Sequence, residues 1–116
     1  MNEIRRSQQD ENLTRVILAA LDIQPGIRLA ILFGSLAVGR ERADSDLDLA
    51  VDAGRRLTAG EKLALMTELA ELTGRTVDLV DLHAVGEPLL GQILRDGKRL
   101  LGGGTCYADL IRRHLF

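Results

Sequence analysis

The sequence is poor in several residue types that mark other classes of protein. Among its 116 residues there are one cysteine, Cys106, two histidines, no tryptophan and only 3% aromatic residues. A single cysteine cannot form an internal disulfide, which is typical of proteins kept in a reducing cytoplasm. Neither His83 nor His114 has a second histidine or a cysteine at the spacing of zinc ligands, so we expect no zinc site.

Long apolar stretches and a strong excess of one charge are missing as well. The longest uncharged run, residues 29–39, is too short to cross a bilayer, and the polar N-terminus lacks the pattern of a signal peptide. The net charge of −2 gives no basic surface, which argues against direct binding of nucleic acid. We expect a single cytoplasmic domain over residues 1–116, with no membrane contact and with residues 1–9 frayed.

A short apolar run and a glycine–serine pair begin the most informative part of the chain. Residues 28–33 predict a buried strand, which Gly34 and Ser35 end. A glycine at this point allows the backbone to approach a ligand closely. Ser35 is placed to cap a short helix through residue 38, and the free N–H groups at a helix start bind phosphate well. The same pair is also typical of an ordinary strand-to-helix turn.

Two carboxylates follow in a second strand pattern. Acidic and apolar residues alternate from Asp46, so the side chains of Asp46 and Asp48 are expected on the same face of a strand. Two carboxylates held close together repel each other unless a cation lies between them. Mg²⁺ prefers oxygen ligands of this kind and usually keeps room for substrate phosphates. The alternative is a half-exposed strand with a solvated acidic face.

The rest of the chain alternates helices with strands. Thr58 and Glu61 form a capping-box pattern, and Gly74 fits the end of the helix that they begin. The expected buried stripe of this helix consists of Leu65, Met66, Leu69 and Leu72. Expected helices cover residues 11–21, 58–73, 86–96 and 105–116, and expected strands cover residues 27–33, 47–52, 76–82 and 98–101. This order predicts an α/β (α+β) fold, a small mixed sheet of three to four strands with helices packed on it.

A third carboxylate lies in the strand expected at residues 76–82. Asp78 stands between apolar residues, where a carboxylate is costly unless it is paired or bound to a metal. If this strand lies beside residues 47–52, Asp78 completes a cluster of three carboxylates. Asp81 competes for the role but ranks behind, because it lies nearer the strand end. The alternative places Asp78 at the solvated rim of the sheet.

Together, these motifs resemble those of the polymerase-beta-like nucleotidyltransferase superfamily. The glycine–serine pair at 34–35 is followed, after ten residues, by Asp-Leu-Asp at 46–48. The fuller pattern, Gly-Ser-x-Ala-x-Gly-Arg at 34–40 and Asp-Ser-Asp-Leu-Asp-Leu at 44–49, is similar to that of the minimal nucleotidyltransferases (MNT). Members of that small stand-alone branch are often encoded as antitoxins beside a HEPN-type toxin.

The resemblance implies a fold, a metal site and a reaction. It implies the superfamily's mixed sheet, with Asp46, Asp48 and Asp78 as catalytic residues that hold Mg²⁺, two ions in all. ATP is the implied substrate, and Asp78 is the implied general base for the acceptor hydroxyl. Pyrophosphate would leave.

The implied phosphate ligands are Gly34, Ser35, Arg40 and Ser45, although Ser45 also fits a role, with Asp44, in shaping the turn before Asp46. Many relatives carry an arginine where this chain has Val38, and that difference leaves the affinity for phosphate open. Arg40 follows one residue later and presents a fork suited to phosphate, with Arg42 as a second candidate. An equally good interpretation is that these loop arginines are only solvated and bind no phosphate.

The chain is too short to carry the second domain that usually positions an acceptor, which points to a separate partner or a self-dimer. The resemblance then implies an antitoxin that transfers AMP from ATP to a hydroxyl of a HEPN-type RNase toxin, in a hetero-oligomer or homo-oligomer. One alternative is a catalytically weak antitoxin that neutralises its toxin by occlusion. Another is a transferase for a small molecule of the aminoglycoside type.

Overall fold

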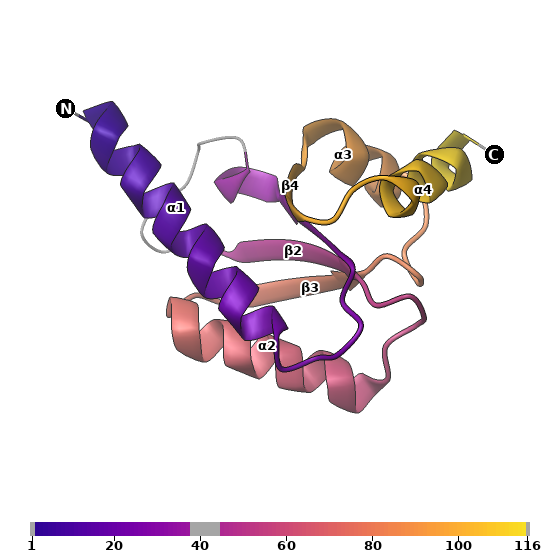
Figure 1. The fold of residues 1–116 in the computed structure, drawn as a ribbon, viewed down its shortest axis with the longest axis horizontal. Helices are drawn as coiled ribbons and strands as arrows, with labels where there is room; N and C mark the ends of the chain where they lie inside the picture. The colour runs from indigo at the N-terminus through magenta and orange to yellow at the C-terminus, as the bar shows by residue number, and fades with distance from the viewer. Residues whose placement is uncertain (1, 38–44, 116) are drawn as a thin grey trace.

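The computed structural model describes residues 2–37 and 45–115 and shows four α-helices around a four-stranded mixed sheet (Figure 1). This architecture confirms the expected fold class. The elements, in chain order, are α1 (Asn2–Leu21), β1 (Leu29–Phe33), the 3₁₀ turn η1 (Gly34–Leu36), β2 (Leu47–Asp52), α2 (Ala59–Thr73), β3 (Val77–Asp81), α3 (Leu89–Asp96), β4 (Lys98–Leu101) and α4 (Thr105–Leu115).

The strand order is β3-β2-β1-β4, and it brings four strand ends together. β1 runs antiparallel to both β2 and β4, whereas β2 and β3 are parallel. The C-terminal end of β1 therefore lies beside the N-terminal ends of the other three strands. The glycine–serine turn leaves the sheet at this end, and all three candidate carboxylates lie there.

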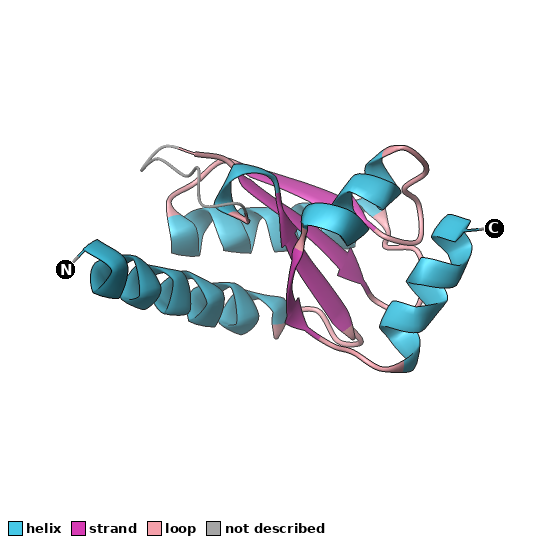
Figure 2. Ribbon diagram, turned by 90° about the horizontal axis from the view of Figure 1, so that it is seen from above, coloured by secondary structure: helices cyan, strands magenta, loops and turns pink. Residues whose placement is uncertain are grey.

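Helices cover both faces of the sheet, which explains why β1 is apolar at every position. Figure 2 shows α1 and α2 on one side of the strands and α3 and α4 on the other. Ala30 and Leu32 pack in the core beneath α1 and α2, whereas Leu29 and Ile31 pack in the core beneath α3 and α4. A strand that is covered on both faces loses the apolar–polar alternation of a half-exposed strand.

The predicted caps of α2 are present, but one of its expected core residues is not buried. The Thr58 hydroxyl accepts a hydrogen bond from the Glu61 N–H, the Glu61 carboxylate accepts one from the Thr58 N–H, and Gly74 ends the helix in the left-handed conformation. Leu65 and Leu69 are fully buried, and Met66 is partly buried against them. Leu72 is 49% exposed, so its place in the buried stripe was wrong.

The first helix is longer than the apolar pattern indicated. α1 begins at Asn2, whereas the periodic apolar residues predicted a helix only from residue 11, after a frayed segment. Polar residues extend this helix because backbone hydrogen bonding along the axis does not depend on an apolar face. Within residues 2–37 and 45–115, no helix is both long and apolar enough to cross a membrane.

Candidate functional site

Two of the candidate carboxylates lie side by side at the shared end of the strands. Asp48 of β2 is in register with Asp78 of β3 and, on its other side, with Phe33 of β1. Residues in register on neighbouring strands point to the same face of a sheet, here the face that α3 and α4 cover. Asp48 is half-buried and Asp78 is exposed, so the pair opens to solvent beyond the helices.

Gly34 makes room for the Asp48 side chain. Gly34 has a φ of 72°, and a Cβ atom added to it would clash with Oδ2 of Asp48 and lie 3.0 Å from its Cγ. Sequence reasoning assigned the glycine to the approach of a ligand. In the described structure, the group that comes closest is the carboxylate of Asp48, so the glycine–serine turn and the carboxylate strand form one packed unit.

The electrostatics of Asp48 differ from those of a structural aspartate. Burial raises the pKa of the Asp48 carboxyl above its ordinary value, and the negative charges of Asp78 and Asp46 raise it further. All three influences disfavour the ionised form of Asp48. A cation placed among these carboxylates would reverse that effect.

The donor set fits a hard divalent cation, although the side chains are not drawn together around one point. Among the residues that the structure describes, no three His, Cys, Asp or Glu side chains already lie in a metal-holding arrangement. Asp46, Asp48 and Asp78 supply only carboxylate oxygens, which Mg²⁺ prefers. Their mutual repulsion is the physical reason to expect that a cation would close the cluster.

The remaining sequence-predicted residues fall into three groups. Asp46 lies just before β2 with an exposed side chain, and Ser45 precedes it, partly buried. Ser35 lies inside η1 and is not its cap: the cap position is Phe33, which makes no side-chain cap hydrogen bond. The prediction of a Ser35 cap was therefore wrong. Positions 38–44, which include Arg40, its alternative Arg42 and the substituted Val38, lie outside the described residues.

Sequence reasoning missed a second aspartate on β2. Asp52 is 3% exposed, and its Oδ1 accepts a hydrogen bond from the N–H of Gly54 at 2.7 Å. The same oxygen lies 2.7 Å from Nε2 of His83 and 3.3 Å from Nε of Arg28. Burial raises the pKa of Asp52, but the hydrogen bonds from Gly54, Arg28 and His83 outweigh burial and hold it below its usual range. The Asp-Ala-Gly sequence, typical of a side-chain-stabilised turn, was the available signal.

Asp81 also has a structural role. It is 7% exposed; its Oδ2 accepts a hydrogen bond from the N–H of Leu57, and its Oδ1 accepts one from the N–H of His83. These bonds fix the loop before α2 and the turn after β3. Because both oxygens bind backbone groups away from Asp48, Asp81 is not a competitor of Asp78.

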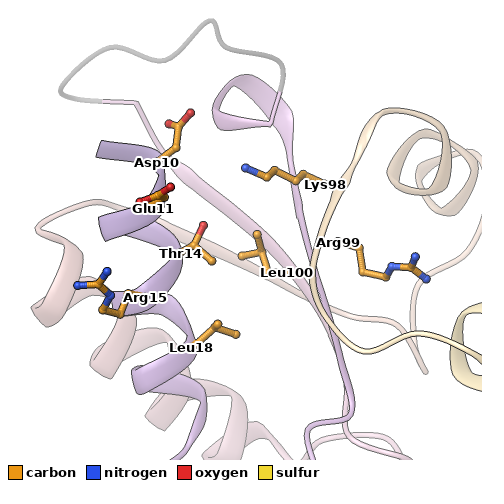
Figure 3. A pocket seen from close by; sticks show the side chains of 8 residues that line it. All are labelled: Asp10, Glu11, Thr14, Arg15, Leu18, Lys98, Arg99 and Leu100. Atoms are coloured by element: carbon orange, nitrogen blue, oxygen red, sulfur yellow. The ribbon is translucent and has the colours of Figure 1, made fainter. Parts of the chain in front are cut away.

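A groove of about 640 Å³ lies elsewhere, between α1 and the edge strand β4. Figure 3 shows Lys98 extending into it toward Asp10, whereas Arg99 points away toward α4, where its guanidinium lies over the Tyr107 ring. Lys98 is in register with Leu32, which packs in the core beneath α1 and α2. The groove therefore opens on the face opposite to Asp48, and the three carboxylates do not line it.

The chain is similar to known proteins in both sequence and structure. The family model described as "Polymerase beta, Nucleotidyltransferase" matches residues 16–103, a span that includes all three carboxylates. "Protein adenylyltransferase MntA" of Shewanella oneidensis is 35% identical over 94 residues, which cover 81% of this chain and 68% of that protein.

Two solved structures show the likeness in three dimensions. A toxin–antitoxin crystal structure with AMP-PNP matches with a TM-score of 0.81 and 31% identity, over 88% of this chain and 83% of that one. The complex of a tri-AMPylated Shewanella oneidensis HEPN toxin with its MNT antitoxin matches with a TM-score of 0.75 and 28% identity, over 91% and 87% of the two chains.

Proposed function

Because this chain belongs to the polymerase beta nucleotidyltransferase family, we propose that it is an Mg²⁺-dependent protein adenylyltransferase that moves AMP from ATP to a hydroxyl of a HEPN-type toxin. The observation that carries the proposal is the register of Asp48 with Asp78 beside Gly34. Support for the substrates comes from the relatives, one named a protein adenylyltransferase and another solved with an AMPylated HEPN toxin. Modification would silence the toxin, which makes this protein its antitoxin.

The reaction joins the acceptor oxygen to the α-phosphorus of ATP and releases pyrophosphate. Asp46, Asp48 and Asp78 are the residues that would hold Mg²⁺, and two such ions, when bound, would neutralise phosphate charge and acidify the acceptor hydroxyl. Asp78 is exposed at the start of β3, so we assign to it the acceptance of the hydroxyl proton. Asp48 is half-buried against Gly34, a fixed position that suits a ligand more than a mobile base.

Binding of the triphosphate falls to the turn after β1 and to the segment before β2. Gly34 would offer its backbone N–H, and Ser35 and Ser45 would offer hydroxyl groups. Arg40 would bind a phosphate through its guanidinium fork. This assignment of Arg40 rests on its place in the motif, since the residue is outside the described part of the chain.

The acceptor side of the site would come from the partner protein. The relatives' complexes pair an MNT antitoxin with a HEPN toxin, and a hetero-oligomer of the same kind is our proposal for this chain. Both proteins would meet in the cytoplasm, where ATP and Mg²⁺ are abundant.

Transfer of label from α-labelled ATP tests the proposal. Wild type and the Asp48→Asn variant are incubated with Mg²⁺ and lysate of the source cell, and labelled bands are identified by mass spectrometry. Asp22→Asn is the matched control, because it removes one carboxylate charge from the exposed turn after α1. We expect one labelled HEPN-type band with wild type and with Asp22→Asn, and none with Asp48→Asn. γ-labelled ATP should give no label in that band, since its labelled phosphate leaves with pyrophosphate.

A different pattern would replace the proposal with one of its alternatives. If Asp48→Asn still neutralised the toxin in cells without any transfer of label, occlusion would be the mechanism. If label entered small molecules and no protein, the acceptor class would be wrong.

A further inference from the structure

Arg75 connects the turn before β3 to the backbone that leads into β2. It lies in the turn between α2 and β3, and its Nη1 donates a hydrogen bond to the carbonyl oxygen of Ser45 at 2.9 Å. One step further along, the N–H of Leu47 donates to the carbonyl of Thr76 at 2.8 Å. The Arg75 guanidinium therefore adds one more hydrogen bond between these two segments, beyond the backbone bond of Leu47. This added bond lies at the residue just before Asp46.

Arg75 is itself held by the end of α2. Its N–H donates to the hydroxyl of Thr73 at 3.3 Å, and that hydroxyl donates to the carbonyl of Leu69 at 2.6 Å. Leu69 is fully buried in the core beneath α1 and α2. A chain of hydrogen bonds thus runs from the core, through Thr73 and Arg75, to the residue before Asp46.

We propose that Arg75 is a positioning residue that fixes the backbone before Asp46, so that Asp46 meets Asp48 and Asp78 at the metal site. The backbone at Asp46 needs this hydrogen bond because Asp46 precedes β2 and has an exposed side chain. Asp48, in contrast, lies within the hydrogen-bonded strand and packs against Gly34. The inference rests on the proposed function for the identity of the metal site. It adds a residue outside both the glycine–serine turn and the carboxylates.

Positioning and phosphate binding by Arg75 predict different measurements. A residue that bound the triphosphate would raise the KM for ATP when removed, and metal binding without nucleotide would not change. A residue that positions Asp46 acts on the metal ligands, so its loss would weaken metal binding in the absence of nucleotide. At saturating metal, such a loss would leave the KM for ATP near its wild-type value and lower kcat.

The direct test is Mn²⁺ binding without nucleotide, measured by electron paramagnetic resonance. For Arg75→Gln we expect an affinity about tenfold weaker than wild type, the usual size of an effect on residues that orient metal ligands. Arg56→Gln is the matched control, because it removes the same charge from the exposed loop at the far end of β2, and wild-type affinity is expected there. Arg75→Lys keeps a donor and should recover most of the lost affinity. Thermal unfolding checks that each variant is folded.

Equal Mn²⁺ affinity in wild type and Arg75→Gln would overturn the inference, as would an equal loss in Arg56→Gln or a wild type that binds no Mn²⁺. If Arg75→Gln does not fold, Thr73→Val takes its place, because it frees the Arg75 backbone, and an unchanged affinity there would count against the inference. Failure of the proposed function would look different. In that case wild type would bind Mn²⁺, and Arg75→Gln would weaken it, yet no AMP would reach a protein.

Discussion

Replacement of Gly34 by alanine would have two effects, strain in the backbone and a clash with the Asp48 side chain, and a second glycine allows them to be measured separately. Gly34 and Gly74 have nearly the same backbone conformation, with φ of 72° and 68°. A Cβ on Gly34 would clash with the Asp48 carboxylate, whereas a Cβ on Gly74 would have nothing within 4 Å. Gly74→Ala is therefore a control that carries the backbone strain of Gly34→Ala without its contact.

The expected sizes of the two effects follow from this difference. Left-handed backbone costs an alanine roughly 1 kcal/mol, so both variants should lose about that much stability. For a domain of this size, the loss corresponds to a fall in Tm of about 4 °C. In Gly34→Ala the end of the Asp48 side chain must also swing aside, and a misplacement of about 1 Å in an active site can cost a factor of about 100 in rate.

Three measurements on the two variants decide the question. Thermal unfolding of the metal-free proteins should give similar Tm values, and transfer of label from α-labelled ATP should fail only in Gly34→Ala. Mn²⁺ binding without nucleotide should also be weakened only in Gly34→Ala, because the clash acts on Asp48, a proposed metal ligand. Equal Mn²⁺ affinity in the two variants would refute the reasoning, and Gly34 would then act on the phosphates alone.

Replacing each of the two aspartates of β2 by asparagine should change the stability of the protein in opposite directions. Asp48→Asn should raise the Tm of the metal-free protein, because it removes the repulsion between Asp48 and Asp78. Neighbouring strands are about 4.8 Å apart, and repulsion across that distance in a solvent-like medium is worth about 1 kcal/mol. Added Mg²⁺ should no longer stabilise this variant, and calorimetry with and without the ion would check both points. Asp52→Asn should lower the free energy of unfolding at pH 7 by about 2 kcal/mol, the scale of hydrogen bonds to a charged group. Because the folded pKa of Asp52 is lowered, its contribution is complete above the unfolded pKa of about 4 and is lost as the pH falls through the folded value. The free energies of unfolding of wild type and Asp52→Asn, measured by denaturant titration, should therefore converge in acid. A difference that stayed constant with pH would contradict the ionic role of Asp52.

The fold could be predicted from the sequence because its signals are local. Alternation of apolar residues, the Thr58–Glu61 capping box and the glycines at helix ends each depend on a few neighbours in the chain. The exposure of Leu72 could not be predicted this way, because it depends on which part of α2 the rest of the fold covers. The environment of Asp52 depends likewise on distant residues, since its partner His83 lies 31 positions later in the chain. Arg75 gave no signal, since its partner is a backbone carbonyl 30 positions away.

Asp48 and Asp52 show how the same face of one strand can serve two purposes. Both point to the side that α3 and α4 cover, four positions apart. At one end the fold surrounds Asp52 with Gly54, Arg28 and His83, and the pKa falls. At the other end the influences on Asp48 are burial and two like charges, and the pKa rises. Stability alone would favour a neutral residue at position 48. The cation proposed for this site would offset the repulsion on Asp48 when it binds.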